Sequence, residues 1–539
     1  MRSMEQPFRQ RASRFVAIAG LAASVGALST ESLDPSAGLL KTGQTTCWPY
    51  IGINDPQMPC AGTGQDGDFQ IGVARSYTDN GNGTITDNAT GLTWETLVNQ
   101  DFAPNAGNLH DADNAYNPLT AAFQKIADLN TANFAGFSDW RLPNIKELRS
   151  LVFFGSSSPS VDSAFNDAGA NSRTRPGTYW SSTTFPSQPF NEWAVGFTTG
   201  VSSLIPKTAA ANNFCCFVRA VRGPVGAVAA GAVLKTGQTQ CWDSAGAEIP
   251  CAGTGQDGEL QKGVAQSYSD NGDGTITDRA TALMWEKLGS LDFVANPSDP
   301  HDVDNNTYTW AQAFQKIADL NTANFAGHID WRLPNVMELE SLAVFGKATS
   351  RLPGPETPAV EPPFDNDTDS FTRSNGYWSS TTGLSLTGQA NGVNFLAGNV
   401  YFLFKTQPFA NGSVRAVRGP VDVSPPTAAD VSGSVSLTFG GFTFNPIARR
   451  YVQKVTLTNA SPATIGGPVS LVLDNLSGNA TLFNATGSTL LVLPAGSPYI
   501  DANVTLSAAQ STTVTLQFNN PSNAAIAYDP RVLAATGSR

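Results

Sequence analysis

One long segment of the chain occurs twice with the same motifs in the same order, and this duplication constrains the fold more than any other feature. The hexapeptide Asp-Trp-Arg-Leu-Pro-Asn spans residues 139–144 and again residues 330–335. The run Tyr-Trp-Ser-Ser-Thr-Thr follows each copy, at residues 179–184 and 377–382. The spacing predicts a tandem duplication of one large domain rather than a short-period solenoid.

Each hexapeptide predicts the start of a helix, because its proline disfavours helical backbone at the preceding residue. In the first copy Asn144 suits the N-cap, and Glu147 stands three residues on, where its carboxylate can reach back to the cap. Two alternatives remain for Arg141 and Arg332: they are binding residues, or they tie down backbone carbonyls or a carboxylate in the core. The second is the simpler interpretation.

The first 29 residues predict a secretory signal peptide. A basic segment with four arginines precedes an apolar run at residues 15–28, which is short for a membrane span. The alternative is a retained N-terminal anchor. We expect no membrane insertion once the signal has been removed.

The charge balance is acidic. The formal net charge is −12, and residues 1–29 contribute four arginines against Glu5, or +3, which leaves −15 for the mature chain. Such a surface argues against nucleic acid or an anionic membrane as the main partner.

Six cysteines suggest an oxidising compartment. Cys47 and Cys60 flank a short loop in the first copy, and Cys241 and Cys251 flank the equivalent loop in the second, so we predict two local disulfides. Each closed loop of this size is worth about 3 kcal/mol in the chain-entropy model. The adjacent residues 215 and 216 are also cysteines, and they form either a vicinal disulfide or two buried thiols.

Two polar clusters invite a calcium hypothesis. Residues 79–87 and 270–278 are rich in Asn, Asp and Gly, but their spacing favours a hairpin turn over an EF-hand loop. The second cluster combines an imidazole with hard oxygens that could hold a divalent cation, although a solvated turn is the simpler alternative. Its residues are His110, Asp111 and Asp113 in the first copy and His301, Asp302 and Asp304 in the second.

The repeated motifs also carry a family resemblance. Their order, closing on Val-Arg-Ala-Val-Arg-Gly-Pro at residues 218–224 and 414–420, resembles the DUF1566 family, which includes the C-terminal domain of the Legionella collagen-like adhesin. The resemblance covers residues 39–224 and 233–420. It implies an α+β, C-type-lectin-like fold related to formylglycine-generating enzymes, and an extracellular bacterial protein that binds a glycan or a surface protein. The resemblance further implies that some relatives are adhesins for sulfated glycans, whereas this chain is acidic and has no collagen-like Gly-x-y run.

Differences between the copies indicate where a specific ligand could bind. The segment from Leu151 to Arg175 corresponds to a longer, more acidic stretch from Ala343 to Arg373. Variable loops often carry recognition, and the alternative is sequence drift on a surface without a function. Trp193 has no aromatic equivalent in the second copy, so we predict it as a copy-specific ligand contact; the alternative is a partly buried strand residue.

We expect no enzymatic activity. The sequence contains only three histidines and none of the common hydrolase or phosphate-binding motifs. The adjacent cysteines occur in one copy alone, which does not match the cysteine pair of formylglycine-generating enzymes.

The region after the second copy predicts a third domain, residues 430–539. Short segments of alternating apolar and polar residues, divided by Gly, Pro and Asn turns, are typical of an immunoglobulin-like or fibronectin-like β-sandwich. We therefore expect a secreted or surface-displayed bacterial protein. Three hypotheses for its role remain: adhesion through the repeats, a structural role in the cell envelope and, as a distant alternative, a formylglycine-generating-like or glycan-acting enzyme.

Overall fold

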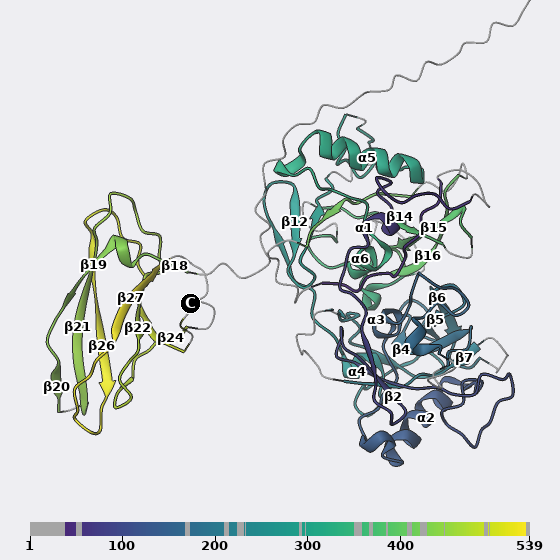
Figure 1. Ribbon diagram of the computed structural model, residues 1–539, viewed down its shortest axis with the longest axis horizontal. Helices are drawn as coiled ribbons and strands as arrows, with labels where there is room; N and C mark the ends of the chain where they lie inside the picture. Colours follow the sequence, from purple (N-terminus) through teal and green to yellow (C-terminus); the bar gives the residue numbers. More distant parts are fainter. Residues whose placement is uncertain are drawn as a thin grey trace, which may run out of the picture. The chain divides into compact units, whose positions relative to one another are not determined.

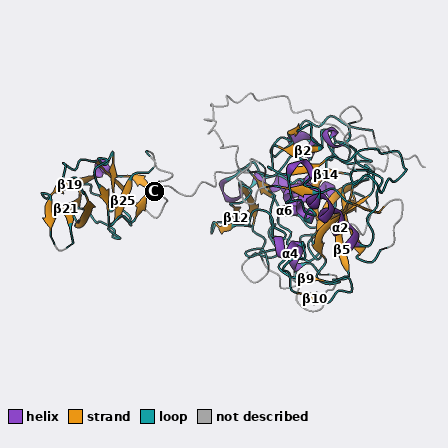
Figure 2. Cartoon of the chain, turned by 90° about the horizontal axis from the view of Figure 1, so that it is seen from below, coloured by secondary structure: helices purple, strands orange, loops and turns teal. Residues whose placement is uncertain are grey.

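A computed structural model describes most of the chain, and the described ranges are 38–49, 56–167, 173–209, 215–223, 231, 233–289, 294–296, 298–349, 358–365, 370–383, 386–406, 412–420, 428–446, 448–489, 494 and 496–534. The predicted signal peptide, residues 1–29, lies outside them. Strands and loops predominate, and the helices are short (Figures 1 and 2). The chain divides into two compact units, Met1–Ala265 with Gly289–Pro420, and Gln266–Leu288 with Val421–Arg539.

Repeat 1 contains two four-stranded sheets, with strand orders β1-β2-β3-β8 and β6-β5-β4-β7. All pairings are antiparallel except that of β4 with β7. The strands are β1 (Tyr77–Asp79), β2 (Thr84–Asp87), β3 (Thr93–Glu95), β4 (Thr178–Thr184), β5 (Asn191–Gly196), β6 (Val201–Pro206), β7 (Cys215–Phe217) and β8 (Val221–Arg222). The helices are α1 (Asp66–Phe69), α2 (Leu119–Thr131) and α3 (Ile145–Ser150), with 3-10 turns at Phe134–Gly136 and Ser163–Phe165.

Within the first unit, repeat 2 follows the same plan. A three-stranded antiparallel sheet has the order β14-β15-β16. The strands are β9 (Cys241–Trp242), β10 (Glu248–Ile249), β14 (Gly376–Thr382), β15 (Gln389–Asn394), β16 (Asn399–Phe404) and β17 (Val417–Arg418). The helices are α4 (Asp257–Leu260), α5 (Trp310–Thr322) and α6 (Val336–Ser341), with 3-10 turns at Phe325–Gly327 and Phe345–Lys347.

The local elements follow the sequence signals. The turn between β1 and β2 is the predicted hairpin, in which Asp79 accepts from Gly81 N and Asn80 donates to Thr84. Helix α3 has the predicted capping box, because Asn144 accepts from Glu147 N and the Glu147 carboxylate accepts from Asn144 N. Helix α6 has the same cap.

Each repeat begins with an arm, which we define as residues 38–74 (arm 1) and 233–265 (arm 2). A backbone bridge closes the base of each arm, between Leu40 and Val73 and between Leu234 and Val264. A disulfide ties the loop inside each arm. Figure 1 shows α1, which belongs to arm 1, beside β14 of repeat 2, and α4 of arm 2 packs in the same way on β4 of repeat 1.

The arms are therefore exchanged between the repeats. Gln44 of arm 1 pairs with the Thr382 backbone through two hydrogen bonds of 2.7 and 2.9 Å. Gln238 of arm 2 makes the equivalent pair with Thr184, at 2.6 and 2.9 Å. These contacts occur in both directions, arm 1 on repeat 2 and arm 2 on repeat 1, so within the first unit a pseudo-twofold axis relates the exchanged parts of the two repeats.

The second unit contains two groups of strands. Strands β11 (Tyr268–Asp270), β12 (Thr275–Asp278) and β13 (Leu283–Glu286) pair antiparallel in that order. The C-terminal region has two antiparallel sheets, β18-β27-β22-β25-β24 and β19-β21-β26-β23, with β20 also paired to β21. Its strands are β18 (Ala429–Asp430), β19 (Val435–Phe439), β20 (Thr443–Asn445), β21 (Arg450–Asn459), β22 (Ser470–Asp474), β23 (Thr481–Leu482), β24 (Gly487–Ser488), β25 (Pro498–Asp501), β26 (Ser511–Asn519) and β27 (Asp529–Ala534).

Both C-terminal sheets contribute to one apolar core. Val455, Leu457 and Leu516 come from one sheet, and Leu471 and Val532 come from the other. This two-sheet packing agrees with the alternating pattern in the sequence.

Candidate ligand-binding groove

A groove in the first unit lies where arm 1 crosses repeat 2. Its volume is about 660 Å³. The arm, helix α5 and the second hexapeptide each supply part of the wall. The lining residues are Gly62, Thr63, Gly64, Asp68, Phe69, Ala311, Phe314, Gln315, Ile317, Ala318, Asn321, Trp331, Arg332 and Leu333.

The arm presents an aromatic ring to this groove. Phe69 ends helix α1 and is 47% exposed, although large apolar side chains are usually covered. The Asp68 carboxylate accepts from Gly64 N at 3.0 Å and so holds the loop before α1. Gly67 allows this close packing, because a Cβ there would lie 2.7 Å from the Thr46 carbonyl oxygen.

Helix α5 supplies the opposite wall. Phe314 packs edge-on against the buried Trp310, with ring centroids 5.0 Å apart. The next residue, Gln315, donates a hydrogen bond from its side-chain amide to the Asp319 carboxylate at the exposed surface. The arm passes close over this helix, since a Cβ on Gly64 would lie 3.2 Å from the Phe314 ring. The groove thus combines aromatic and amide side chains, the mixture of apolar surface and a few polar groups that is typical of small-molecule sites.

The groove lacks a cation for an anionic ligand among the residues that line it. Arg332 is the single basic residue of the lining, and both of its terminal nitrogens lie 2.6 Å from the Glu338 carboxylate. Arg141 makes the same bidentate pair with Glu147. The simpler interpretation of these arginines is therefore correct: each ties down a carboxylate in the core.

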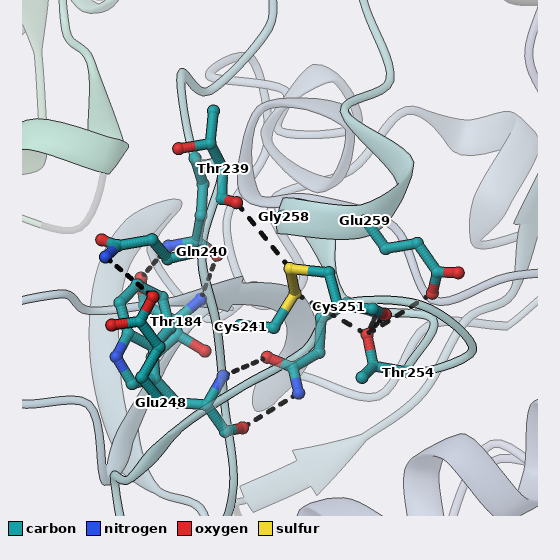
Figure 3. The surroundings of a disulfide bond; sticks show 12 residues. Thr184, Thr239, Gln240, Cys241, Glu248, Cys251, Thr254, Gly258 and Glu259 are labelled. Carbon is teal, nitrogen blue, oxygen red and sulfur yellow. Dashed lines mark hydrogen bonds between the residues drawn. A yellow bond between two sulfur atoms is a disulfide. The ribbon is translucent and has the colours of Figure 1, made fainter.

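Arm 2 crosses helix α2 of repeat 1 in the same way, but with different side chains. Gly255 of arm 2 passes Phe123 of α2, and a Cβ on this glycine would lie 3.5 Å from the ring. Leu260 holds the position that Phe69 holds in arm 1, so the exposed aromatic ring is specific to the first groove. Figure 3 shows the disulfide loop inside arm 2, where Thr254 donates to Glu259 and the disulfide joins Cys241 to Cys251.

The predicted disulfides are confirmed. Cys47 is bonded to Cys60 and Cys241 to Cys251, each inside its own arm. Of the two alternatives for the adjacent cysteines, the structure shows the disulfide: Cys215 is bonded to Cys216 at the start of β7.

Trp193 is not a ligand contact, and this prediction is wrong. The side chain is 2% exposed and packs edge-on against Phe185 and Phe345, with ring centroids 5.2 and 5.5 Å apart. Phe345 belongs to repeat 2, so the tryptophan fills the interface between the repeats. The sequence difference at this position therefore reflects packing rather than recognition.

The predicted metal ligands of the first copy do not converge. The His110 Nδ1 atom lies 2.8 Å from the Glu95 carboxylate, and Asp113 forms an ion pair with Arg175. Asp111 accepts from the Asp113 backbone N–H inside its own turn.

The second copy uses its polar side chains in the same way. Asp302 accepts from Asp304 N at 2.8 Å, Asp304 pairs with Arg373, and the His301 ring packs on Phe325. Across the described residues, no group of three or more His, Cys, Asp or Glu side chains could hold a metal ion. The polar clusters therefore stabilise their loops, as the turn alternative proposed.

Sequence reasoning missed the buried carboxyl groups beneath the arms. Asp66 of arm 1 accepts from Thr42 and from Thr381 of repeat 2, both at 2.7 Å. Asp257 accepts from Thr236 at 2.6 Å and from Thr183 of repeat 1 at 2.7 Å. Burial raises the pKa of Asp66 to about 6 and that of Asp257 to about 7, against the lowering effect of these hydroxyls.

A third buried carboxyl distinguishes the repeats. Burial raises the pKa of Glu192 to about 7, although Lys207 and Thr184 oppose the shift. In repeat 1, Glu192 pairs with Thr184 across the sheet. The equivalent residue of repeat 2, which pairs with Thr382, is Ala390 and has no carboxyl group. Lys405, the equivalent of Lys207, lies instead over the Trp310 ring at 3.8 Å and donates to Thr382.

Phe69 was also missed, although the sequence held a signal for it. Both arms carry Ala-Gly-Thr-Gly-Gln-Asp-Gly, and the two residues that follow are Asp-Phe in arm 1 and Glu-Leu in arm 2. An aromatic residue that replaces an aliphatic one directly after an identical motif marks a copy-specific surface.

Comparison with known proteins gives one family. Residues 83–222 and 274–418 match the Lcl C-terminal domain family. No curated protein matches the chain. A family GH18 chitinase from Chromobacterium violaceum aligns at 14% identity over 60% of this chain and 44% of the chitinase chain, with a TM-score of 0.12. The alignment thus spans less than half of that chitinase, and the TM-score is too low to support any argument.

Proposed function

Because this chain belongs to the Lcl C-terminal domain family, with two copies that fill more than half of its length, we propose that it is an exported bacterial binding protein that holds a neutral glycan in the groove of arm 1. The observation that carries the proposal is the exposed Phe69 ring, which together with Phe314 lines a cleft of about 660 Å³. Sugar rings present apolar C–H faces and polar edges, and this cleft offers both kinds of partner.

The chemistry of the cleft favours an uncharged ligand. Arg332 is held by Glu338, and Asp68 adds a carboxylate to the wall. A sulfated glycan would meet no unpaired cation among the lining residues, and the chain as a whole carries a net charge of −12. The ligand of this protein would therefore differ from the sulfated glycans that some relatives bind.

Export is part of the same proposal. Three disulfides lie within the described residues, which suits an oxidising compartment. Across those residues, no helix combines the length and apolar character needed to cross a bilayer. We further propose that the repeats adopt a C-type-lectin-like fold and that the C-terminal sheets form an immunoglobulin-like spacer.

A test of the groove compares two matched variants of the full chain. Phe69→Ala removes the exposed ring, and Leu260→Ala truncates the equivalent position of arm 2 as the control. On an array of neutral glycans, we expect Phe69→Ala to weaken binding about tenfold or more, because loss of a ring contact costs about 1.4 kcal/mol or more.

We expect Leu260→Ala to bind as the unmodified chain does, and a calcium chelator to leave binding unchanged. Equal binding by the Phe69→Ala chain would remove the groove as the site. Absence of binding to any neutral glycan would refute the proposed ligand class.

A structural role in the cell envelope is the second candidate, and one observation favours it. The C-terminal unit exposes three phenylalanines close together in the chain, Phe439, Phe442 and Phe444. Exposed apolar groups of this size are typical of protein contacts. In this case the chain would bind no small ligand, and both arm variants would behave alike.

A further inference from the structure

The contact between helices α3 and α6 lies on the pseudo-twofold axis of the first unit. A small cavity of about 40 Å³ marks this place. Its lining consists of five pairs of equivalent positions, one member from each repeat. The pairs are Leu39 with Val233, Leu40 with Leu234, Lys146 with Met337, Arg149 with Glu340, and Ser150 with Ser341.

Positions on such an axis face their own equivalents. Two identical repeats would therefore place identical side chains against each other here. Three of the five pairs have kept the same chemical character. The other two have not, because Lys146 faces a position occupied by Met337 and Arg149 faces Glu340.

Arg149 and Glu340 form a buried ion pair between the repeats. The Arg149 Nε atom lies 2.6 Å from a Glu340 carboxylate oxygen, and the two side chains are 1% and 6% exposed. Arg149 also donates to the Gly200 carbonyl at 2.6 Å. Like charges at this depth would have no water to screen them, so an Arg–Arg or Glu–Glu pair would oppose docking.

We propose that Arg149 and Glu340 act as a pairing code, so that repeat 1 accepts repeat 2 and rejects a second copy of itself. A second molecule of this chain could then associate only by exchanging unlike repeats, with its repeat 1 on the first molecule's repeat 2. The code matters for the arms as well. Each arm packs on the opposite repeat, so the groove of arm 1 is complete only when unlike repeats dock.

The pseudo-twofold symmetry also predicts that the charges at positions 149 and 340 can be exchanged. Gly398 holds the position in repeat 2 that Gly200 holds in repeat 1, and the two turns share the same backbone conformation, with φ of 77° and 79°. An arginine at position 340 would therefore find an equivalent carbonyl. Exchange of the two charges should be tolerated, whereas reversal of either one alone should not.

The test uses full-length chains and needs no ligand. The variant Glu340→Arg places arginine on both sides of the axis, and Arg149→Glu places glutamate on both sides. We expect each single variant to melt on the order of 10 °C lower than the unmodified chain, as expected for a broken buried pair. The double variant R149E/E340R should recover most of this loss. Lys347→Glu is the control, because Lys347 and Glu361 form an exposed pair whose loss should not change the melting temperature.

Co-expression of the two single variants gives the decisive readout. Their repeats are complementary between molecules, so light scattering should show a one-to-one dimer with twice the mass of one chain. This expectation holds even if neither variant folds alone. Unchanged melting of the single variants, failure of the double variant to recover, or absence of the mixed dimer would each overturn the proposal. Because none of these measurements involves a glycan, they are independent of the proposed function.

Discussion

At the scale of single residues, one buried carboxyl group joins each arm to the opposite repeat. Asp257 accepts hydrogen bonds from threonines of both repeats, and its second oxygen has no hydrogen-bond partner among the described residues. A charged carboxylate is costly at such a position, which is the reason that burial raises the pKa of Asp257 to about 7. The arm contact is therefore most stable when this group is protonated.

The pH dependence follows from the sign of that shift. Between about pH 4 and pH 7 the folded chain keeps a proton that the unfolded chain releases, so the free energy of unfolding falls as the pH rises. Asp257→Asn keeps the shape and removes the titration. At pH 8 we expect this variant to be more stable than the unmodified chain by roughly 2 to 4 kcal/mol, and near pH 4 to differ little.

Chemical denaturation of both chains across this pH range provides the measurement. Asp319→Asn on the exposed surface of α5 serves as the control and should follow the unmodified chain. Parallel stability curves for the unmodified chain and the Asp257→Asn chain would contradict the role assigned to this carboxyl.

At the scale of elements, a single residue, Asn144, both caps helix α3 and binds arm 2. Asn144 caps the helix through its side-chain oxygen, and its amide nitrogen donates to the Lys262 carbonyl of arm 2 at 3.1 Å. In repeat 2, Asn335 caps α6 and donates to the Ile71 carbonyl of arm 1 at 3.3 Å. The repeated motif therefore serves both the local helix and the exchanged arm.

Substitution at this cap separates the two tasks. Asn144→Ser keeps an oxygen for the cap and loses the amide donor, so we expect a loss of about 1 kcal/mol of stability. Asn144→Ala loses both and should cost about 2 kcal/mol. Amide hydrogen exchange should show faster exchange in arm 2 for both variants, with fraying of α3 only in the alanine variant. Unchanged exchange in arm 2 for the serine variant would contradict the link between cap and arm.

At the scale of the whole molecule, the two repeats behave as halves of one body rather than as separate modules. The sequence divides them at residues 39–224 and 233–420, but the hydrogen bonds of the arms and the Arg149–Glu340 pair cross that division. An isolated repeat would lose the arm of its partner and with it one wall of the groove. Binding is therefore best measured on the intact chain.

Cleavage of the backbone between the repeats tests whether they form one body. A protease site inserted between Gly223 and Gly231 should be cleavable without separating the repeats, because the exchanged arms still hold them. We expect the two fragments to coelute in size-exclusion chromatography under native conditions and to separate in denaturant. After the same cut, a chain carrying Arg149→Glu should come apart more readily. Immediate separation of the fragments of the unmodified chain would show that the arms do not hold the repeats together.

Much of the local structure was predictable from short-range signals. The capping boxes, the hairpin of β1 and β2 and both arm disulfides depend on residues near each other in the chain. Prediction failed where partners come from the other repeat. The lack of an aromatic equivalent suggests that Trp193 contacts a ligand, but its packing partner Phe345 lies 152 positions away on the other repeat, where the sequence does not reveal it.

The sequence by itself determined the duplication, the family, the local caps and turns and the pairing of cysteines within each arm. These depend on pattern and on contacts across a few residues, which the order of side chains specifies directly. Only the tertiary structure decided which repeat each arm packs against, because an arm has the same chemistry for either repeat and its own repeat lies nearest in the chain. The groove and the buried Asp66 and Asp257 follow from that exchange, and the facing of Arg149 with Glu340 follows from the docking of α3 on α6.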